Sequence, residues 1–261
     1  MATARPATLS ISSAMAREEF LHDLLTITGD TRLLWLPKGT ETTTSLDESL
    51  TGRTLTYDAT IAARLSALGL GYAVSFNGTS QYATTPDTAN LSFGDGTTDS
   101  AFSIIALCNV TNTAALRYIL AKDDGTDREW VLEVQADDTL AFRVRDDSAA
   151  TLATRASDAV ITQDAWHLFS ATYTAATGGA TAANDMTLYQ DGAAIASTAT
   201  NSGTYVAMEN LTAPVRIGTR SDGASFFSGS MALVVISAVA LSASDHWAIK
   251  KLVNSYFALS L

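Results

Sequence analysis

The sequence predicts an all-β fold: an antiparallel two-sheet jelly-roll β-sandwich with a short N-terminal helix and a C-terminal helix. Stretches in which apolar and polar residues alternate follow one another along most of the chain, and this alternation is typical of half-buried strands. Pairs of residues that favour tight turns separate these stretches: Asn77-Gly78, Asp124-Gly125, Asp137-Asp138, Asp191-Gly192 and Asp222-Gly223. A chain of 261 residues is long enough for one large β-sandwich.

Helical periodicity marks the first segment of the chain. Ser12 or Ser13 can cap a helix whose apolar face contains Phe20, Leu21, Leu24 and Leu25, and Gly29-Asp30 ends it. This apolar face packs either on the chain's own sandwich or on a neighbouring subunit, and the sequence leaves both alternatives open. Residues 1–30 are therefore expected to form an N-terminal arm for anchoring or assembly, and residues 31–261 a single jelly-roll domain.

Strands are expected through the middle of the chain. They are predicted at 32–36, 54–57, 73–76, 81–84, 101–110, 117–121, 129–135, 140–145, 166–174, 186–190, 193–198, 215–218 and 226–236. Two connections need separate predictions. Ile61, Leu65 and Leu68 have helical spacing, so a short helix closed by Gly69 is expected there. Residues 175–184, built from Ala, Thr and Gly, are expected to form a flexible loop.

A second helix is predicted at the C-terminus. Ser242 and Asp245 form a capping-box pattern. An apolar stripe follows with spacing i, i+3, i+4, i+7, formed by Ile249, Leu252, Val253 and Tyr256. This helix is expected to lie against the sandwich.

Charge and cysteine content exclude several classes of protein. The formal net charge is -11, with only 16 Lys and Arg residues, whereas nucleic-acid binding needs clustered cations. The longest apolar run, 231–241, is too short for a bilayer-spanning helix, and the N-terminus lacks the apolar segment of a secretory signal. Cys108 is the only cysteine, so no disulfide forms within the chain, and its place in an alternating strand predicts a buried thiol.

An ordered set of short motifs resembles the laminin G-like domains of the concanavalin A-like lectin and glucanase jelly rolls. It begins with the strand pair around Phe76-Asn77-Gly78 and Tyr82, and it ends with Leu241-Ser242 at the start of the last helix. The residues that carry this fold signature are Phe76, Gly78, Trp166, His167, Tyr189, Asp191, Gly192, Gly218 and Gly229. The resemblance runs from about residue 31 to the C-terminus. It implies the fold, but the fold alone does not imply one function.

Catalysis is not expected. The glucanase branch that the chain resembles places two carboxylates two residues apart on one strand, and the nearest counterpart here is Glu133-Val134-Gln135-Ala136-Asp137. Its central residue is an amide, and Glu133 and Asp137 are roughly 13 Å apart along an extended strand, whereas a retaining pair needs about 5–5.5 Å. The three histidines, His22, His167 and His246, lie in no catalytic or metal-binding motif.

A calcium ion is the cofactor that the resemblance suggests. The candidate ligands are Asn77, Asp95 and Asp99, because calcium prefers carboxylate and amide oxygens. Ala232 stands where the family usually has a carboxylate, so no tightly bound metal is expected. A glycan would need aromatic and polar side chains near loop tips, and the candidates are Tyr82, Asp123, Asp124, Asp127, Trp130 and Asp222.

The motifs lead to a prediction of a non-enzymatic structural or adhesion protein. Laminin G-like jelly rolls without disulfides or a signal peptide are similar to modules of bacteriophage virion proteins, including head decorations, fibres and tail proteins. This similarity implies a virion location, attachment to itself or to other virion proteins through the N-terminal arm, and a jelly roll that binds host-surface glycans. The alternatives are a soluble lectin module and a degenerate glycoside hydrolase. Neither nucleic-acid binding nor membrane insertion is expected.

Overall fold

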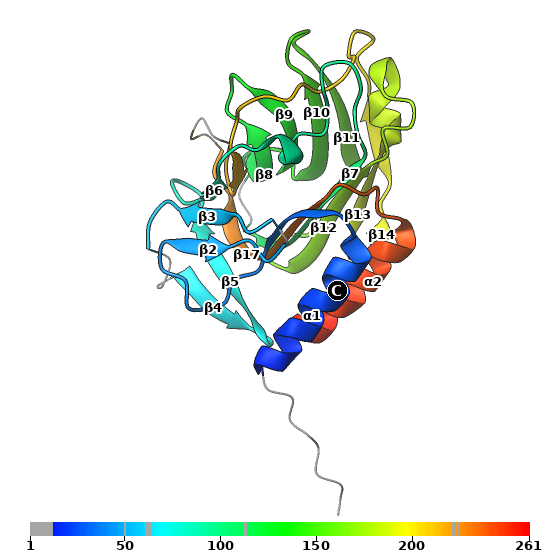
Figure 1. Cartoon of the computed structure of the whole chain (residues 1–261). Helices are drawn as coiled ribbons and strands as arrows, with labels where there is room; N and C mark the ends of the chain where they lie inside the picture. The colour runs from blue at the N-terminus through cyan, green and yellow to red at the C-terminus, as the bar shows by residue number, and fades with distance from the viewer. Residues whose placement is uncertain (1–12, 50, 61–63, 112–113, 221–222, 224) are drawn as a thin grey trace, which may run out of the picture.

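The computed structural model describes residues 13–49, 51–60, 64–111, 114–220, 223 and 225–261. Two antiparallel sheets lie face to face, and two helices lie side by side against one of them (Figure 1). The predicted antiparallel β-sandwich with an N-terminal and a C-terminal helix is confirmed. Among the described residues, no helix is long and apolar enough to cross a membrane.

Sheet A is the layer between the second sheet and the helices. In spatial order it contains β14 (Ala193–Ala194), β13 (Met186–Gln190), β12 (Trp166–Tyr173), β7 (Phe102–Val110), β17 (Ser228–Ser237), β5 (Gly71–Asn77) and β4 (Leu65–Leu68), with β1 (Thr31–Trp35) paired to β17. Its central strands are buried on both faces. Phe102, Ile104 and Ala106 point between the sheets, whereas Ile105 and Leu107 point toward the helices.

Sheet B is the outer layer of the sandwich. In spatial order it contains β15 (Ser197–Thr200), β11 (Thr151–Val160), β10 (Thr139–Asp146), β9 (Arg128–Val134), β8 (Arg117–Asp123), β16 (Val215–Ile217), β6 (Ala83–Thr85), β3 (Thr54–Tyr57) and β2 (Thr44–Leu46). One face contributes to the core, where the ring of Trp130 lies 6.1 Å from that of Phe102 and its indole nitrogen donates to the Leu91 carbonyl at 3.0 Å. Neither helix covers the opposite face of this sheet.

The helical layer consists of α1 (Ser13–Thr28) and α2 (Ala243–Phe257). Phe20 of α1 stacks on Tyr256 of α2 with 4.3 Å between ring centroids, and it meets Phe257 edge-on. With Leu24, these residues form a second apolar cluster against the outer face of sheet A. Of the two alternatives for the first helix, packing on the chain's own sandwich is the one that the structure shows.

Helix α2 begins with the predicted capping box. The Ser242 side chain accepts from the Asp245 amide, and the Asp245 carboxylate accepts from the Ser242 amide. One turn into the helix, the His246 ring stacks on Tyr189 with 3.8 Å between centroids. Its two nitrogens lie 3.0 Å from Ser170 Oγ and 2.9 Å from Thr172 Oγ1. The histidine therefore joins α2 to β12 and β13.

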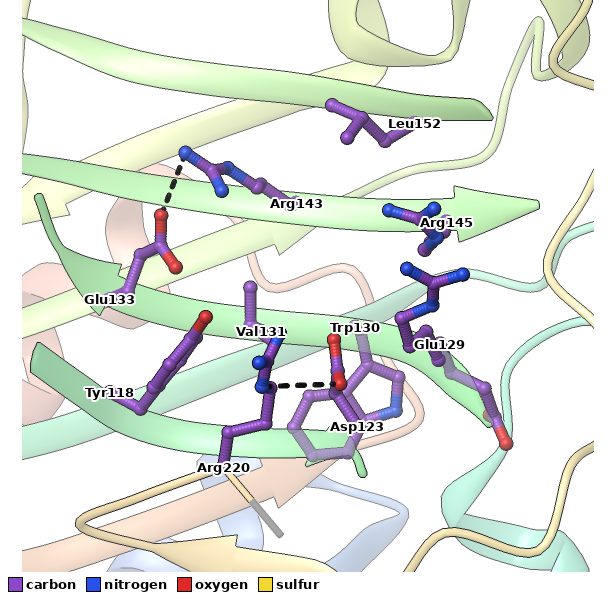
Figure 2. A pocket seen from close by; sticks show the side chains of 11 residues that line it. Tyr118, Asp123, Glu129, Trp130, Val131, Glu133, Arg143, Arg145, Leu152 and Arg220 are labelled. Atoms are coloured by element: carbon purple, nitrogen blue, oxygen red, sulfur yellow. Dashed lines mark ion pairs between the residues drawn. The ribbon is translucent and has the colours of Figure 1, made fainter. Parts of the chain in front are cut away.

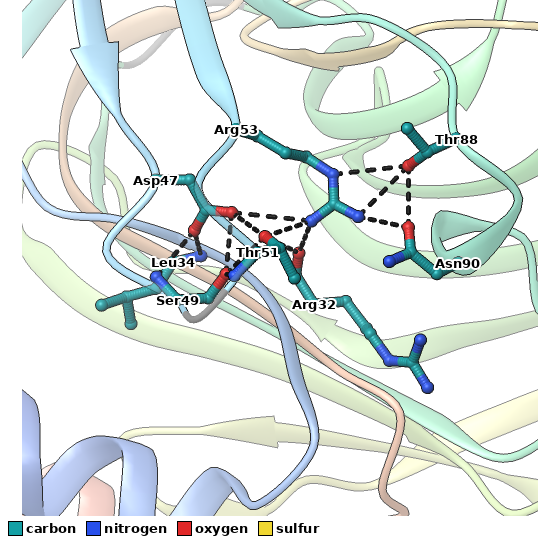
Figure 3. Close-up of polar contacts among 8 residues, drawn as sticks. All are labelled: Arg32, Leu34, Asp47, Ser49, Thr51, Arg53, Thr88 and Asn90. Carbon is teal, nitrogen blue, oxygen red and sulfur yellow. Dashed lines mark hydrogen bonds and ion pairs between the residues drawn. The ribbon is translucent and has the colours of Figure 1, made fainter.

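A polar network ties the outer hairpin of sheet B to the first strand of sheet A (Figure 3). The Asp47 carboxylate accepts from the Leu34 and Ser49 amides at 2.8 and 2.9 Å. The Arg53 guanidinium contacts the Arg32 carbonyl, and it also reaches Asn90, which belongs to the short 3-10 helix η2 (Ala89–Leu91). Because both groups are largely shielded from water, their hydrogen bonds fix the edge of the sandwich.

Several predicted details are confirmed. The thiol of Cys108 is fully buried, and burial raises its pKa. Asp191 and Gly192 both have positive φ, at 52° and 76°, as the tight turn between β13 and β14 requires. Gly229 of β17 has φ 137°, and a β-carbon there would lie 2.0 Å from the Asn109 carbonyl oxygen of β7. Only glycine therefore fits at this position.

Several sequence-based assignments are wrong or incomplete. Leu65–Leu68, predicted as part of a helix, is strand β4, which pairs with β5; residues 61–63 lie outside the described part of the chain. The loop predicted to be flexible contains the 3-10 helix η3 (Gly179–Asp185), with Ala182 and Ala183 buried. Strands β2 and β11 were not predicted, and the single strand predicted at 193–198 is two strands, β14 in sheet A and β15 in sheet B.

The packing of α1 leads to a stability prediction. Leu24 is fully buried under α2, whereas Met15 on the same helix is 63% exposed. Leu24→Ala should lower the free energy of unfolding by about 2–5 kcal/mol, because it leaves a cavity in the second apolar cluster. Met15→Ala should change it by less than about 0.5 kcal/mol. Urea denaturation followed by circular dichroism measures both. Equal effects would mean that α1 does not fold together with the sandwich.

The burial of His246 leads to a pH prediction. Burial lowers the pKa of His246 from 6.5 to about 4, so only the unfolded chain takes up the proton between these values. The contribution of neutral His246 to the free energy of unfolding is therefore fully present above pH 6.5. It falls by up to about 3 kcal/mol as the pH drops toward 4. The difference in unfolding free energy between the native chain and His246→Gln should shrink over this window in urea titrations. A constant difference from pH 7 to pH 4 would contradict the assignment.

Candidate binding face on sheet B

The open face of sheet B carries a continuous row of side chains from six neighbouring strands. Cross-strand pairing places them in the order Thr84, Arg216, Ala121, Val131, Arg143 and Thr154. Adjacent strands are about 4.8 Å apart, so the backbones at Arg216 and Arg143 are separated by roughly 14 Å. Two arginines thus flank a floor of smaller apolar residues.

A hollow of about 410 Å³, open solvent included, lies over one half of this row. Figure 2 shows its lining from β8, β9 and β10 together with Arg220, which follows β16. Arg143 Nη2 contacts Glu133 Oε1 at 2.9 Å, and Arg220 Nε lies 3.7 Å from Asp123 Oδ1. At the same end, Arg128 and Arg145 both contact Asp147 Oδ1, at 2.8 and 3.3 Å. We call these seven charged residues, together with Tyr118, the arginine site.

Exposure separates the two signs of charge in the arginine site. The four arginine side chains keep 22–31% of their surface accessible, whereas Glu133 keeps none and Asp123 and Asp147 keep 12% and 19%. The guanidinium groups therefore form the layer that meets solvent, and the carboxylates lie beneath. A ligand on this face would meet mainly N–H donors.

Aromatic rings lie beside these charges. The Arg220 guanidinium lies 5.6 Å from the centre of the Tyr118 ring, and Tyr118 packs with Ala121 and Val131 in a small apolar cluster separate from both cores. At the other end of the row, Arg216 lies over the Tyr82 ring at 4.4 Å, and the Phe226 ring lies 6.5 Å from that of Tyr82. Such cation–π pairs hold arginines in place at modest energetic gain.

Burial raises the pKa of the Glu133 carboxyl, and Arg143 opposes this rise. It also raises the pKa of Asp123, against a backbone hydrogen bond from Gly125 and the charge of Arg220. Glu129 lines the hollow too, but its carboxylate contacts Lys122 Nζ at 2.7 Å, and burial raises the pKa of Glu129 to about 7. Lys122 also donates to the Leu211 and Ala213 carbonyls, so this pair holds a loop rather than a ligand.

Three carboxylates line the hollow, but Glu129 is paired with Lys122, and the positions of Glu133 and Asp123 along the strands do not suit glycoside hydrolysis. Glu133 lies opposite Tyr118, and Asp123 follows Tyr118 by five residues on β8, which is roughly 16 Å along the strand. Retaining enzymes need about 5–5.5 Å and inverting enzymes about 6.5–9.5 Å between the two carboxyl groups. Asp137, the other predicted partner of Glu133, caps a turn by accepting from Thr139.

The three calcium candidates each have protein donors of their own. Asn77 Oδ1 accepts from the amides of Thr79, Ser80 and Gln81, and Asp95 Oδ1 accepts from those of Thr97 and Thr98. Buried Asp99 accepts from the hydroxyls of Tyr173 and Tyr205 at 2.6 and 2.8 Å, and from the Met208 amide. Within the described ranges, no group of three or more potential ligands among His, Cys, Asp and Glu could hold a metal ion.

The predicted glycan candidates fall into separate places. Tyr82 and Asp123 lie on the open face, as described above. Asp124 caps its own turn through Thr126, and Asp127 accepts from the Thr212 amide at 3.0 Å. Trp130 has its ring in the core, facing away from the open side. Asp222 lies outside the described residues.

Sequence reasoning missed the arginines. Arg143 and Arg145 occupy the polar positions of the alternating strand β10, where Leu140, Phe142 and Val144 face the core. That alternation was a signal that both arginines share one open face. Nothing in the sequence indicates that Arg220 joins them, because it is 75 residues further along the chain than Arg145.

Comparison with known families identifies the class of protein. A model described as the concanavalin A-like lectin/glucanases superfamily matches residues 77–245, which is well over half of the chain. The chain therefore belongs to this superfamily, and the predicted resemblance is confirmed. No curated protein matches the sequence.

Solved structures with a similar fold include toxin binding domains. The binding domain of Paraclostridial Mosquitocidal Protein 1 has a TM-score of 0.61 at 14% identity, covering 86% of this chain and 52% of that one. The botulinum neurotoxin serotype G binding domain has a TM-score of 0.63 at 12% identity, covering 85% and 51%. The serotype D ligand binding domain, in a complex with N-acetylneuraminic acid, has a TM-score of 0.59 at 13% identity, covering 88% and 52%. The chain spans about half the length of each, and the likeness concerns the fold.

Proposed function

We propose that the chain is a non-catalytic carbohydrate-binding module whose ligand lies on the open face of sheet B. The observation that carries the proposal is the arginine site, in which four partly exposed guanidinium groups surround a hollow beside Tyr118. Membership of a superfamily of lectins and glucanases supports it. A similar fold occurs in a toxin domain whose structure is a complex with N-acetylneuraminic acid.

The chemistry of the face suits a saccharide. Sugar hydroxyls accept hydrogen bonds, and each guanidinium offers five N–H donors in a fixed plane. The C–H faces of sugar rings pack on aromatic rings, and half-buried Tyr82 offers one beside Arg216. Tyr118 is buried, and its ring holds Arg220 instead. A helix-free face also admits an extended polymer.

The proposed module binds saccharides without hydrolysing them. Glu133 forms an ion pair with Arg143 and lies roughly 16 Å along the strands from Asp123. Each of these carboxylates faces an arginine instead, Glu133 facing Arg143 and Asp123 facing Arg220. The degenerate glycoside hydrolase is thus the less supported of the two alternatives weighed from the sequence.

Binding assays with site variants test the proposal. Arg143→Gln and Arg220→Gln should each weaken binding of a glycan found on an array by about tenfold or more, because each loses charge-assisted hydrogen bonds. Arg32→Gln is the matched control. Arg32 lies on β1 of sheet A, has a similar side-chain exposure and forms an ion pair with Asp30. Calorimetry gives the affinities. The proposal fails if no glycan binds, or if all three variants bind as the native chain does.

We also infer that the module is carried on a bacteriophage virion, with residues 1–30 as the attachment segment and residues 31–261 as the displayed domain. The resemblance to virion modules supports this, as does the position of the helices, which cover sheet A and leave the proposed binding face free (Figure 1). Met15 on α1 and Trp247 on α2 are large apolar side chains exposed on that helical layer.

Light scattering on the full chain tests the attachment. Self-association is expected, because exposed apolar side chains favour contact with another surface. The double variant Met15→Ser and Trp247→Ser should shift the mass toward the monomer. A native chain that stays monomeric at the highest soluble concentration, and that does not bind purified virions, would contradict the assembly role.

A further inference from the structure

We propose that the ligand of the arginine site is an acidic saccharide, whose anionic groups are bound by Arg143 and Arg145 on β10 and by Arg216 at the far end of the row. This inference rests on the proposed function and specifies the chemical class of its ligand. It depends on the separation of charge across the open face, where cations lie outermost.

The first support is the supply of unused donors. Arg143 touches Glu133 through Nη2, and within the described residues its buried Nε atom has no hydrogen-bond partner. Arg145 reaches Asp147 through Nε. Planar guanidinium groups bind carboxylates and sulfates through two parallel N–H donors. Arg145 therefore keeps its terminal N–H groups for a planar or tetrahedral anion, whereas Arg143, whose Nε is buried, must share its terminal N–H groups between Glu133 and the anion.

The second support is the sharing of one carboxylate by two cations. The Nε atoms of Arg128 and Arg145 both lie against Asp147 Oδ1. Like charges held close together repel, and an anion placed above them relieves this repulsion. A neutral sugar would not.

The third support is Arg216. Its guanidinium lies over the Tyr82 ring, and among the described residues its buried Nε atom has no hydrogen-bond partner. Its position is fixed by β16, which pairs Arg216 with Ala121 and Thr84. Two cationic positions roughly 14 Å apart on one row match an oligosaccharide with repeated charges better than a single sugar.

Glu133 competes with an anionic ligand for the Arg143 guanidinium. Its buried carboxylate holds Arg143 from below, so a ligand anion must share that guanidinium. Removing the charge of Glu133 while keeping its shape should therefore strengthen binding of an acidic ligand. A catalytic or purely structural glutamate would not produce this increase.

The experiment uses matched pairs of acidic and neutral probes on the full chain. The first pair is an oligogalacturonate and the same oligosaccharide after reduction of its carboxylates to alcohols. The second is sialyllactose and lactose, and the third is a sulfated heparin oligosaccharide and its desulfated form. At least one acidic probe should bind about tenfold or more tightly than its neutral partner, and its affinity should fall as salt increases. The pair that responds identifies the source of the anion.

Three variants complete the test. Arg143→Lys keeps the charge but loses the planar donor pair, so acidic binding should weaken several-fold. Glu133→Gln should strengthen acidic binding and leave neutral binding unchanged, and Arg32→Gln should change neither. Neutral probes that bind as tightly as acidic ones, with Arg143→Gln weakening both, would overturn this inference and leave the proposed function standing. No binding by any probe would overturn both.

Discussion

The burial of sheet A on both faces is the constraint on which the rest of the structure depends. β7 and β17 present Ile104 and Val234 to the core between the sheets, and Ile105 and Val235 to the helices. A sheet covered in this way has no surface left for a ligand. Sheet B is covered on one face only, so its outer face is the broad β-surface that can carry a site. The placement of α1 and α2 thus decides which sheet is available for binding.

The same constraint explains which patterns the sequence displays. Strands buried on both faces read as continuous apolar runs, as in Met231 to Ile236. Strands with one open face alternate, as β10 does. Because its inward residues are Leu140, Phe142 and Val144, its outward residues are free to be arginine without loss to the core. The contrast between the two strand types therefore marks the layers of the sandwich.

Local signals in the sequence predicted most of the fold. The Asp191-Gly192 turn and the Ser242–Asp245 capping box depend on a few adjacent residues, and both appear as predicted. Strand β11 was missed because three of its ten residues are Ala and one is Asp, which do not favour strands. It is a strand because the long ladder with β10 satisfies its backbone. Leu65–Leu68 likewise follows its partner β5 rather than its own helical spacing.

The candidate site could not be predicted in the same way, because it depends on the register with which the strands of sheet B pair. Ala121, Val131 and Arg143 come from the consecutive strands β8, β9 and β10, but Arg216 comes from the distant strand β16, and only strand pairing places all four in one row. Trp130 shows the reverse case. Its residue type suggested a sugar platform, but it lies one position from Val131 and so points into the core.

The energetics of the buried carboxylates favour a role beyond stability. Burying the charged carboxylates of Glu133 and Asp123 costs free energy. The raised pKa of both groups reflects this cost. Replacing a buried ion pair with apolar residues is often neutral or stabilising, so a sandwich selected only for stability has little reason to keep charges on this face. Here the carboxylates hold arginine side chains upright at the surface, and Tyr118 and Tyr82 restrict them further. Arginines fixed in this way lose less conformational entropy when they bind an anion. The buried acids therefore position the cations, and the exposed cations are the groups positioned to contact a ligand.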